Sequence, residues 1–372
     1  MTATDLVSRL RDRAGELGLG PIGIAPIAPS GHADALRRWL DRGHAGAMAW
    51  MHRTAADSVD LARRFSWARS ALVVAQPYLP YRGARRAQGG LLRHLARYAV
   101  GNDYHATLGR RLESLAAFLR EEAPGTRTRV YIDTGPVLKR ELAARAGLGW
   151  FGKSTNLIVP RGNSWILFGE ILTSQEIAAD DPVADHCGRC TACLDACPTG
   201  AITEPYVVDS TRCISYLTIE LRGRLPDERH ADLGGWVFGC DICQEVCPWN
   251  RKVAPVSDAP FRPASDLEDL RLTDLVRIDE RGFQARFGST ALERPRREGL
   301  VRNALIVAAN TGDGEALEAA VTALEDPDPV VRSTAAVTLG RAEGGTARRA
   351  IDAARGREGI AEVRRDMERA PD

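Results

Sequence analysis

The sequence predicts a three-part protein: an α/β (α+β) domain over residues 1–178, a cysteine-rich domain over residues 179–255 and an α-helical domain over residues 256–372. Three observations support this division. Helical and extended patterns alternate up to about residue 175, all eight cysteines lie between Cys187 and Cys247, and the remaining chain carries alanine-rich helical segments. With 44% hydrophobic and 27% charged residues, the composition is that of an ordinary globular protein.

The N-terminal domain is predicted from helical segments with apolar stripes and from short apolar runs. In the first segment, Leu6, Leu10 and Leu17 share one helical face and Gly18 ends the helix. The predicted helices cover residues 4–18, 32–41, 104–122 and 137–146, and the predicted strands cover residues 21–25, 70–78, 129–132, 157–159 and 165–172. Such alternation is typical of an α/β protein.

The cysteines fall into two spaced groups and one solitary residue. The first group reads C-x2-C-x2-C-x3-C before Pro198, the second reads C-x2-C-x3-C before Pro248, and Cys213 stands between them. A disulfide framework needs an oxidising compartment and usually a small secreted domain, and a zinc site uses pairs of cysteines. Closely spaced cysteines that end in Cys-Pro are instead typical of a bacterial ferredoxin, in which the fourth cysteine binds the other cluster.

This crossing rule divides the eight thiolates into two [4Fe–4S] ligand sets. The first set is Cys187, Cys190, Cys193 and Cys247, and the second is Cys197, Cys213, Cys240 and Cys243. Two clusters in series indicate electron transfer. Because a ferredoxin needs only a small part of this chain, we expect the rest to hold an electron acceptor, a substrate or both.

The C-terminal part from Arg302 onward is predicted to consist of helices separated by Asp-Pro turns. The stretch DPDPVVRSTAAVTLGRA is similar to a HEAT-type repeat, in which proline starts the helix. Repeats of this kind usually bind macromolecules. A helical cap on the protein core is the alternative.

Charge is unevenly distributed although the net charge is only +1. Residues 61–102 contain eight arginines and no Asp or Glu. An ordinary solvated face would explain this run, but the complete lack of acids also indicates a polyanionic partner. The N-terminus has no apolar segment of a secretory signal, and no apolar run is long enough to cross a membrane, so we expect a cytoplasmic protein.

Two segments are candidates for chemistry. Asp133 ends a predicted strand, where its carboxylate can act as a general acid if burial raises its pKa. A helix N-cap is the alternative, which composition alone favours. The turn with Gly147, Gly149 and Gly152 lacks the spacing of a dinucleotide fingerprint, and indicates close backbone approach to a large planar ligand.

Several longer motifs resemble those of the epoxyqueuosine reductase family of tRNA-modifying enzymes. They are NDYHATLGRRL, DTGPVLKRELAARAGLGWFGKS, GNSWILFGEILT, CGRCTACLDACPTGAI, RCISYLTIE and GCDICQEVCPWN. The resemblance covers nearly the whole chain. It implies two [4Fe–4S] clusters, a base-off cob(II)alamin without a protein ligand to cobalt, and a tRNA that carries epoxyqueuosine. It also implies reduction to queuosine, with the epoxide oxygen lost as water, and an electron donor of the flavodoxin or ferredoxin type. We expect a monomer.

The resemblance assigns roles to individual residues. Asp133 matches the family's proton donor, which would protonate the alkoxide as reduced cobalt attacks the epoxide. The residues that match corrin-lining segments are Asp133, Lys153, Ser154, Leu157, Ser164, Phe168, Ser215 and Asp241. The arginines expected to contact tRNA are Arg85, Arg86, Arg93, Arg222 and Arg297, with Arg82, Arg97, Arg224, Arg296 and Arg302 as further candidates.

The sequence departs from the family pattern at several positions. Lys139 stands where relatives often have an acid, Ser154 replaces a common Asn, and Ser58 falls where an arginine can reach the cofactor. The Asp103-Tyr104-His105 triplet does not complete the cobalamin motif D-x-H-x-x-G, so we interpret it as coincidental. A reductive dehalogenase-like enzyme and a non-enzymatic ferredoxin-like electron carrier are the competing interpretations.

Overall fold

The computed structural model describes residues 3–83, 87–160, 163–341 and 345–369. The chain forms two compact units, each assembled from three segments. The first unit consists of Met1–Arg82, Asp103–Thr211 and Ile242–Arg262, and the second of Gly83–Asn102, Arg212–Asp241 and Pro263–Asp372. The three consecutive domains predicted from the sequence do not coincide with these units, because the chain alternates between them along its length.

A four-stranded sheet forms the centre of the first unit. Its strands are β1 (Ile22–Pro26), β2 (Ser70–Pro77), β6 (Ile166–Thr173) and β3 (Thr128–Tyr131), in that order across the sheet. All three pairings are antiparallel. The central strands β2 and β6 are buried over nearly their whole length, as their apolar sequences predict. The unit is therefore of the α+β kind.

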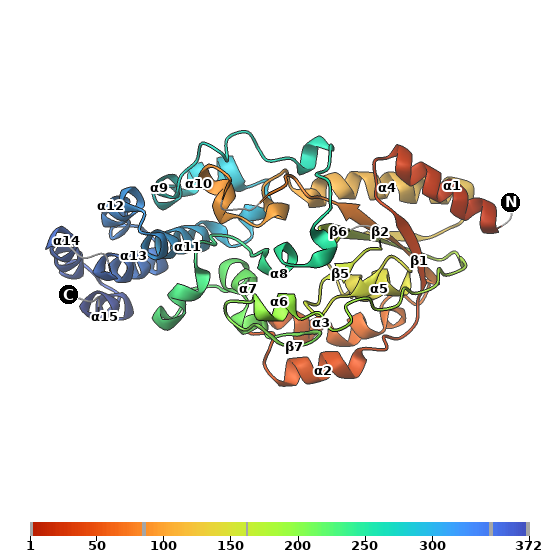
Figure 1. Ribbon diagram of the computed structural model, residues 1–372, viewed down its shortest axis with the longest axis horizontal. Coiled ribbons are helices and arrows are strands. Elements are labelled where there is room, and N and C mark those ends of the chain that lie inside the picture. The colour runs from red at the N-terminus through yellow and green to blue at the C-terminus, as the bar shows by residue number, and fades with distance from the viewer. Residues whose placement is uncertain (1–2, 84–86, 161–162, 342–344, 370–372) are drawn as a thin grey trace. The chain divides into compact units, whose positions relative to one another are not determined.

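Helices cover both faces of this sheet (Figure 1). Helix α4 (Tyr104–Glu122) packs on β3 and β6 and also contacts α1 (Ala3–Glu16). Gly169 faces α4, because a Cβ atom there would lie 2.3 Å from Leu112. The neighbouring Phe168 lies on the opposite face, in a core that α5 (Lys139–Arg145) covers with Leu142.

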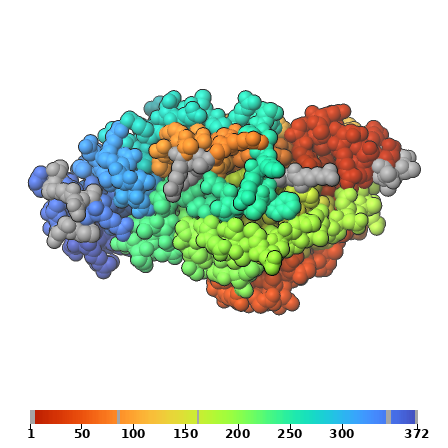
Figure 2. All heavy atoms as spheres, viewed as in Figure 1, coloured from red at the N-terminus to blue at the C-terminus, as the bar shows by residue number. Residues whose placement is uncertain are grey.

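Helix α2 (Ala33–Asp41) lies against the cysteine-rich segment of the same unit, and α3 (Ala49–Val59) contacts α2. The indole N–H of Trp39 donates a hydrogen bond of 2.7 Å to the carbonyl oxygen of Val208. Val208 belongs to the small hairpin of β7 (Ile202–Glu204) and β8 (Val207–Val208). In Figure 2 the orange-red atoms of the helices lie beside the yellow-green atoms of this segment. Helix α3 was not predicted from the sequence.

A short hairpin of β4 (Trp150–Phe151) and β5 (Leu157–Ile158) occupies the glycine-rich segment. A Cβ atom at Gly149 would come within 2.1 Å of the carbonyl oxygen of Ile158, and one at Gly152 within 2.8 Å of the Ile158 side chain. Both glycines are therefore required by the hairpin itself. The interpretation of this turn as a surface for a planar ligand stays a prediction.

The second unit is mainly helical. Its helices are α7 (Ile214–Ile219), α9 (Leu272–Val276), α10 (Glu280–Phe287), α11 (Arg296–Thr311), α12 (Gly314–Ala323), α13 (Pro329–Arg341), α14 (Gly345–Arg355) and α15 (Ala361–Arg369). Helix α11 contacts α7, α9, α12 and α13, and it is buried along most of its length. The predicted helical character of the C-terminal part is confirmed, whereas its assignment to HEAT repeats stays a prediction.

In the part of the chain that the structure describes, no helix combines the length and apolar character needed to cross a membrane.

Candidate active site and iron–sulfur centres

Two short helices of the first unit bring the first predicted ligand set together. Cys193 lies in α6 (Ala192–Asp195), which packs against α8 (Ile242–Glu245), just before Cys247. Burial raises the pKa of the Cys193 thiol, and its neighbours Cys187, Cys247 and Cys190 raise it further. Burial raises the pKa of Cys247 as well, again with contributions from Cys187 and Cys190. These four thiols therefore form one electrostatic group, although they come from two distant segments.

The spacing of these side chains bears on the choice between a zinc ion and a cluster. Within the described ranges, no group of three His, Cys, Asp or Glu side chains converges on a position for one metal ion. Zinc requires its ligands at one tetrahedral centre, whereas a four-iron cluster binds each thiolate to a different iron and so keeps them further apart.

The second predicted ligand set is divided between the two units. Cys197 and Cys243 belong to the first unit, and Cys213 and Cys240 belong to the second. Burial alone would raise the pKa of Cys197, but hydrogen bonds from the backbone and from Thr199 lower it. The Ala201 N–H lies 3.3 Å from Cys197 Sγ, and the Asn156 amide donates to Cys243 Sγ at 3.6 Å. Such donors stabilise thiolates.

Lys153 binds the loop that carries part of the first thiol group. Its ammonium donates hydrogen bonds to the carbonyl oxygens of Gly188 (2.7 Å) and Cys190 (3.0 Å). On the same hairpin, the Trp150 ring meets the rings of His186 and Trp249, each at a centroid distance of 4.9 Å. The hairpin thus supports the loops that carry Cys187 and Cys247. The assignment of Lys153 to a corrin-lining segment stays a prediction.

Asp133 lies in a loop and does not cap a helix. Helix α5 begins at Lys139, and its N-cap residue is Leu138, which makes no side-chain capping bond. Asp133 has a φ of 52°, a left-handed conformation that is unfavourable for a non-glycine residue. Such conformations persist only where the surroundings enforce them, and they are frequent at active sites. The N-cap alternative is therefore wrong for Asp133.

Two donors hold the Asp133 carboxylate. The Tyr104 hydroxyl donates a hydrogen bond to Oδ2, and the Lys139 ammonium forms an ion pair with Oδ1. The Asp133 side chain keeps 22% of its surface exposed, so a substrate can reach it. His105 stacks on Tyr104 at a ring-centroid distance of 4.2 Å. Tyr104 belongs to the Asp103-Tyr104-His105 triplet, which was interpreted as coincidental, and it was not given a role beside Asp133. Its position next to Asp103, the N-cap of α4, was a usable signal.

Four residues predicted to line a corrin make packing contacts or hydrogen bonds within the protein. Leu157 and Phe168 are part of the apolar core under α5. The Ser164 hydroxyl accepts hydrogen bonds from Asn250 (2.9 Å) and Gln244 (3.2 Å). Asp241 is 1% exposed, and it accepts hydrogen bonds from the backbone and the guanidinium of Arg97. The two polar side chains have the internal partners that buried polar groups need, and the assignment of all four residues to a corrin-lining segment stays a prediction. Ser154 and Ser215 are half-buried.

The arginines predicted to contact tRNA have different surroundings. Arg93 is exposed, and Arg85 and Arg86 lie outside the described residues. Arg222 donates to the carbonyl oxygens of Ile219 and Arg294. Arg297 is 6% exposed and forms an ion pair with Asp326, so it is not available to tRNA and its assignment is corrected. Arg97 and Arg302 are likewise buried.

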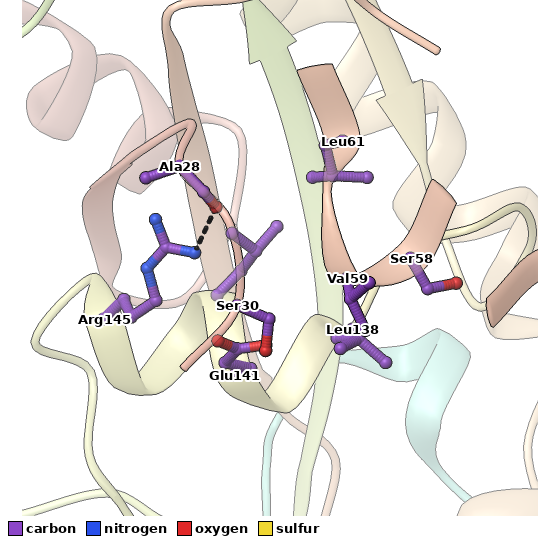
Figure 3. Close-up of a pocket in the computed structure, with 9 residues that line it drawn as sticks. Ala28, Ser30, Ser58, Val59, Leu61, Leu138, Glu141 and Arg145 are labelled. Carbon is purple, nitrogen blue, oxygen red and sulfur yellow. Dashed lines mark hydrogen bonds between the residues drawn. The ribbon is translucent and has the colours of Figure 1, made fainter. Parts of the chain in front are cut away.

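A recess lies beside α5, lined by Ser58, Glu141 and Arg145 among others (Figure 3). Arg145 donates a hydrogen bond to the carbonyl oxygen of Ala28 across its edge. Ser58 therefore lines this recess, and its relation to a cofactor stays a prediction.

An α+β unit that presents a doubly hydrogen-bonded carboxylate, joined to a ferredoxin-type thiol framework, defines an iron–sulfur oxidoreductase. Residues 186–250 match the family described as "4Fe-4S double cluster binding domain", and residues 59–134 match "Epoxyqueuosine reductase QueG, DUF1730". The epoxyqueuosine reductase of Synechococcus sp. (strain CC9605) is 42% identical over 297 residues, which cover 78% of this chain and 91% of that protein.

The relative from Synechocystis sp. (strain ATCC 27184 / PCC 6803 / Kazusa) is 41% identical over 288 residues, with 76% of this chain and 98% of that protein covered. The chain belongs to the epoxyqueuosine reductase family. A solved epoxyqueuosine reductase with an epoxyqueuosine-modified tRNA stem loop has a TM-score of 0.90 and 29% identity, and 99% of this chain and 98% of that chain are covered. The Bacillus subtilis epoxyqueuosine reductase, solved with its catalytic aspartate loop swung out of the active site, has a TM-score of 0.89 at 28% identity, with 99% of each chain covered.

Proposed function

We propose that this protein reduces epoxyqueuosine in tRNA to queuosine. The observation that carries the proposal is the Asp133 loop with its two donors, found together with the four-thiol group in a chain of this family. A related structure contains the modified tRNA stem loop. The reaction takes up two electrons and two protons, breaks both C–O bonds of the epoxide and releases its oxygen as water.

The cysteines supply the electron path in this proposal. Cys187, Cys190, Cys193 and Cys247 bind one [4Fe–4S] cluster, and Cys197, Cys213, Cys240 and Cys243 bind the other. Hydrogen bonds from Asn156 and the Ala201 backbone to cluster sulfurs would stabilise added negative charge and tune the reduction potential. The electrons come one at a time from a donor protein of the flavodoxin or ferredoxin type.

Cobalamin is the proposed acceptor of these electrons. Its amide side chains need hydroxyl and backbone partners, and the half-buried turn from Lys153 to Asn156 offers them, with the Ser154 hydroxyl first among the side chains. The residues proposed to line it are those that match the family's corrin-lining segments: Asp133, Lys153, Ser154, Leu157, Ser164, Phe168, Ser215 and Asp241. When bound, cobalamin supplies a low-valent cobalt nucleophile for C–O cleavage.

Asp133 is the proposed proton donor to the epoxide oxygen. An alkoxide is a poor leaving group, so a proton delivered as the C–O bond breaks lowers the barrier. The Tyr104 hydroxyl orients the carboxylate by its hydrogen bond to Oδ2. Exposed Arg93, together with Arg85 and Arg86, is proposed to contact tRNA phosphates, which predicts binding that weakens steeply with salt.

The test is turnover by anaerobically purified protein with an epoxyqueuosine-modified stem loop, followed by mass analysis of the nucleoside. We expect queuosine, eight irons and one cobalt per chain, and corrin absorbance. Protein with eight irons that leaves the nucleoside unchanged, whether or not cobalamin is added, would contradict the proposed function. Protein that is fully active without cobalt would contradict only the cofactor.

A further inference from the structure

A buried carboxyl group lies behind the Asp133 loop. Glu170 occupies the middle of β6 and is 1% exposed. Its neighbours on the same face of the strand, Phe168 and Leu172, belong to the apolar core that α5 covers. Among the described residues its Oε1 atom has no hydrogen-bond partner. A carboxyl group in such surroundings is costly unless it is protonated or lies near a cation.

Lys139 connects this carboxyl group to Asp133. Its ammonium forms the ion pair with Asp133 Oδ1 and interacts electrostatically with Glu170. The strand register agrees with this arrangement, because Glu170 pairs with Tyr131, two residues before Asp133. The charged or titratable groups around Lys139 are therefore Asp133 from the loop, Glu170 from β6 and Arg140 from α5, with Tyr104 of α4 on the far oxygen of Asp133.

This arrangement raises a question about the source of the proton. An ordinary Asp has a pKa of about 4, and a neighbouring ammonium favours the carboxylate further. The ion pair with Lys139 therefore places a proton-bearing group directly beside the Asp133 carboxylate. Burial and the charge of Arg140 lower the pKa of Lys139, which makes its ammonium a better acid. Burial raises the pKa of Glu170.

We propose that Lys139 is the source of the proton, that Asp133 passes it to the epoxide oxygen, and that Glu170 is a positioning residue that keeps Lys139 charged. The proposal rests on the proposed function. As the C–O bond breaks, an N–H bond of Lys139 breaks, an O–H bond forms on the epoxide oxygen by way of Asp133, and Lys139 is left as a neutral amine. Lys139 then takes a proton from water and supplies the second one, with which the hydroxyl leaves as water. The two electrons come through the clusters from the donor protein.

The first experiment measures the proton affinity of Lys139 without turnover. The chain has only three lysines, Lys139, Lys153 and Lys252, so protein labelled with ¹³C at lysine Cε gives three resonances. In the holoenzyme, K139R removes the Lys139 resonance and thereby assigns it. We expect this resonance to titrate below the ordinary lysine value of about 10.4, and lower still in E170Q, which lacks the counter-charge. An ordinary titration in both proteins would overturn the proposal.

The second experiment compares K139Q with K139R in single turnover on the modified stem loop. Arginine keeps the charge beside Asp133 but does not release a proton. If Lys139 is the proton source, both variants lose roughly 10²-fold in rate, with unchanged iron content and RNA affinity. The wild-type rate then falls as pH rises through the pKa of Lys139 measured by NMR.

A K139R variant as fast as wild type would show that the ion pair only positions Asp133, and would overturn the proposal. K252Q is the matched control and keeps the wild-type rate. If the wild-type protein itself leaves the substrate unchanged, the proposed function fails, while the titration of Lys139 still reports on its environment.

Discussion

At the scale of single residues, the Asp133 loop shows how one carboxylate acquires a defined role. Its backbone is left-handed, its two oxygens have different donors, and part of its surface is open. Tyr104 and Lys139 come from two different helices, α4 and α5, so the carboxylate depends on both faces of the sheet. A polar group held in this way does not need to reorganise when the reaction begins.

Replacement of the Asp133 carboxylate by an amide tests this role. We expect D133N to lose about 10²–10⁴-fold in single-turnover rate, because the amide cannot relay a proton. Iron content and stem-loop affinity should stay at wild-type values. D103N, which alters the nearby cap of α4, is the control and should lose much less. Equal losses in the two variants would indicate a general disturbance of the loop.

At the scale of secondary-structure elements, the periodic helices and buried strands of the first unit were predictable and are confirmed within a few residues. Helix α3, which has no buried residue, was missed. The antiparallel pairing of β2 with β6 depends on the arrangement of distant segments, which local patterns do not specify. Local sequence patterns likewise do not specify that Glu170 and Lys139 interact.

Arg302 of helix α11 was predicted to be an exposed tRNA contact but is buried. A single arginine in a helical pattern predicts an exposed position, yet Arg302 is 0% exposed. Its guanidinium donates hydrogen bonds to the carbonyl oxygens of Leu217, Leu221 and Gly223. The five donors of arginine suit this cluster of acceptors at the end of α7. The cysteines, by contrast, could be predicted as cluster ligands from the sequence, because a four-iron cluster requires cysteines at this spacing along the chain.

The segment Asp227–Leu233, a 3-10 helix that packs on α11, makes stability depend on pH. His230 is 2% exposed, and burial lowers its pKa to about 4. The unfolded chain has a histidine pKa of about 6.5, so between these values only the unfolded state takes up the proton and the folded state loses stability as pH falls. We expect the melting temperature of the holoprotein to fall between pH 7 and pH 5, and to fall less in H230Q. Equal falls in both proteins would contradict this.

At the scale of the whole molecule, the chain alternates between two units, and each predicted cluster draws on segments far apart in the sequence. Loss of one thiol should therefore remove a complete cluster. We expect C247A to hold four irons instead of eight, as measured by iron analysis and by electron paramagnetic resonance of the reduced protein. C247A with a full iron content would contradict the crossed ligand set.

The crossed ligand set has a consequence for biosynthesis. Cys187, Cys190 and Cys193 leave the ribosome well before Cys247, since the segments between them include α7 and the 3-10 helix that contains His230. A nascent chain that ends before α8 has only three of the four thiols. With the proposed ligand set, iron delivery to this site would therefore wait until most of the protein has been synthesised, and scaffold proteins that insert clusters would meet a chain whose sheet is already complete.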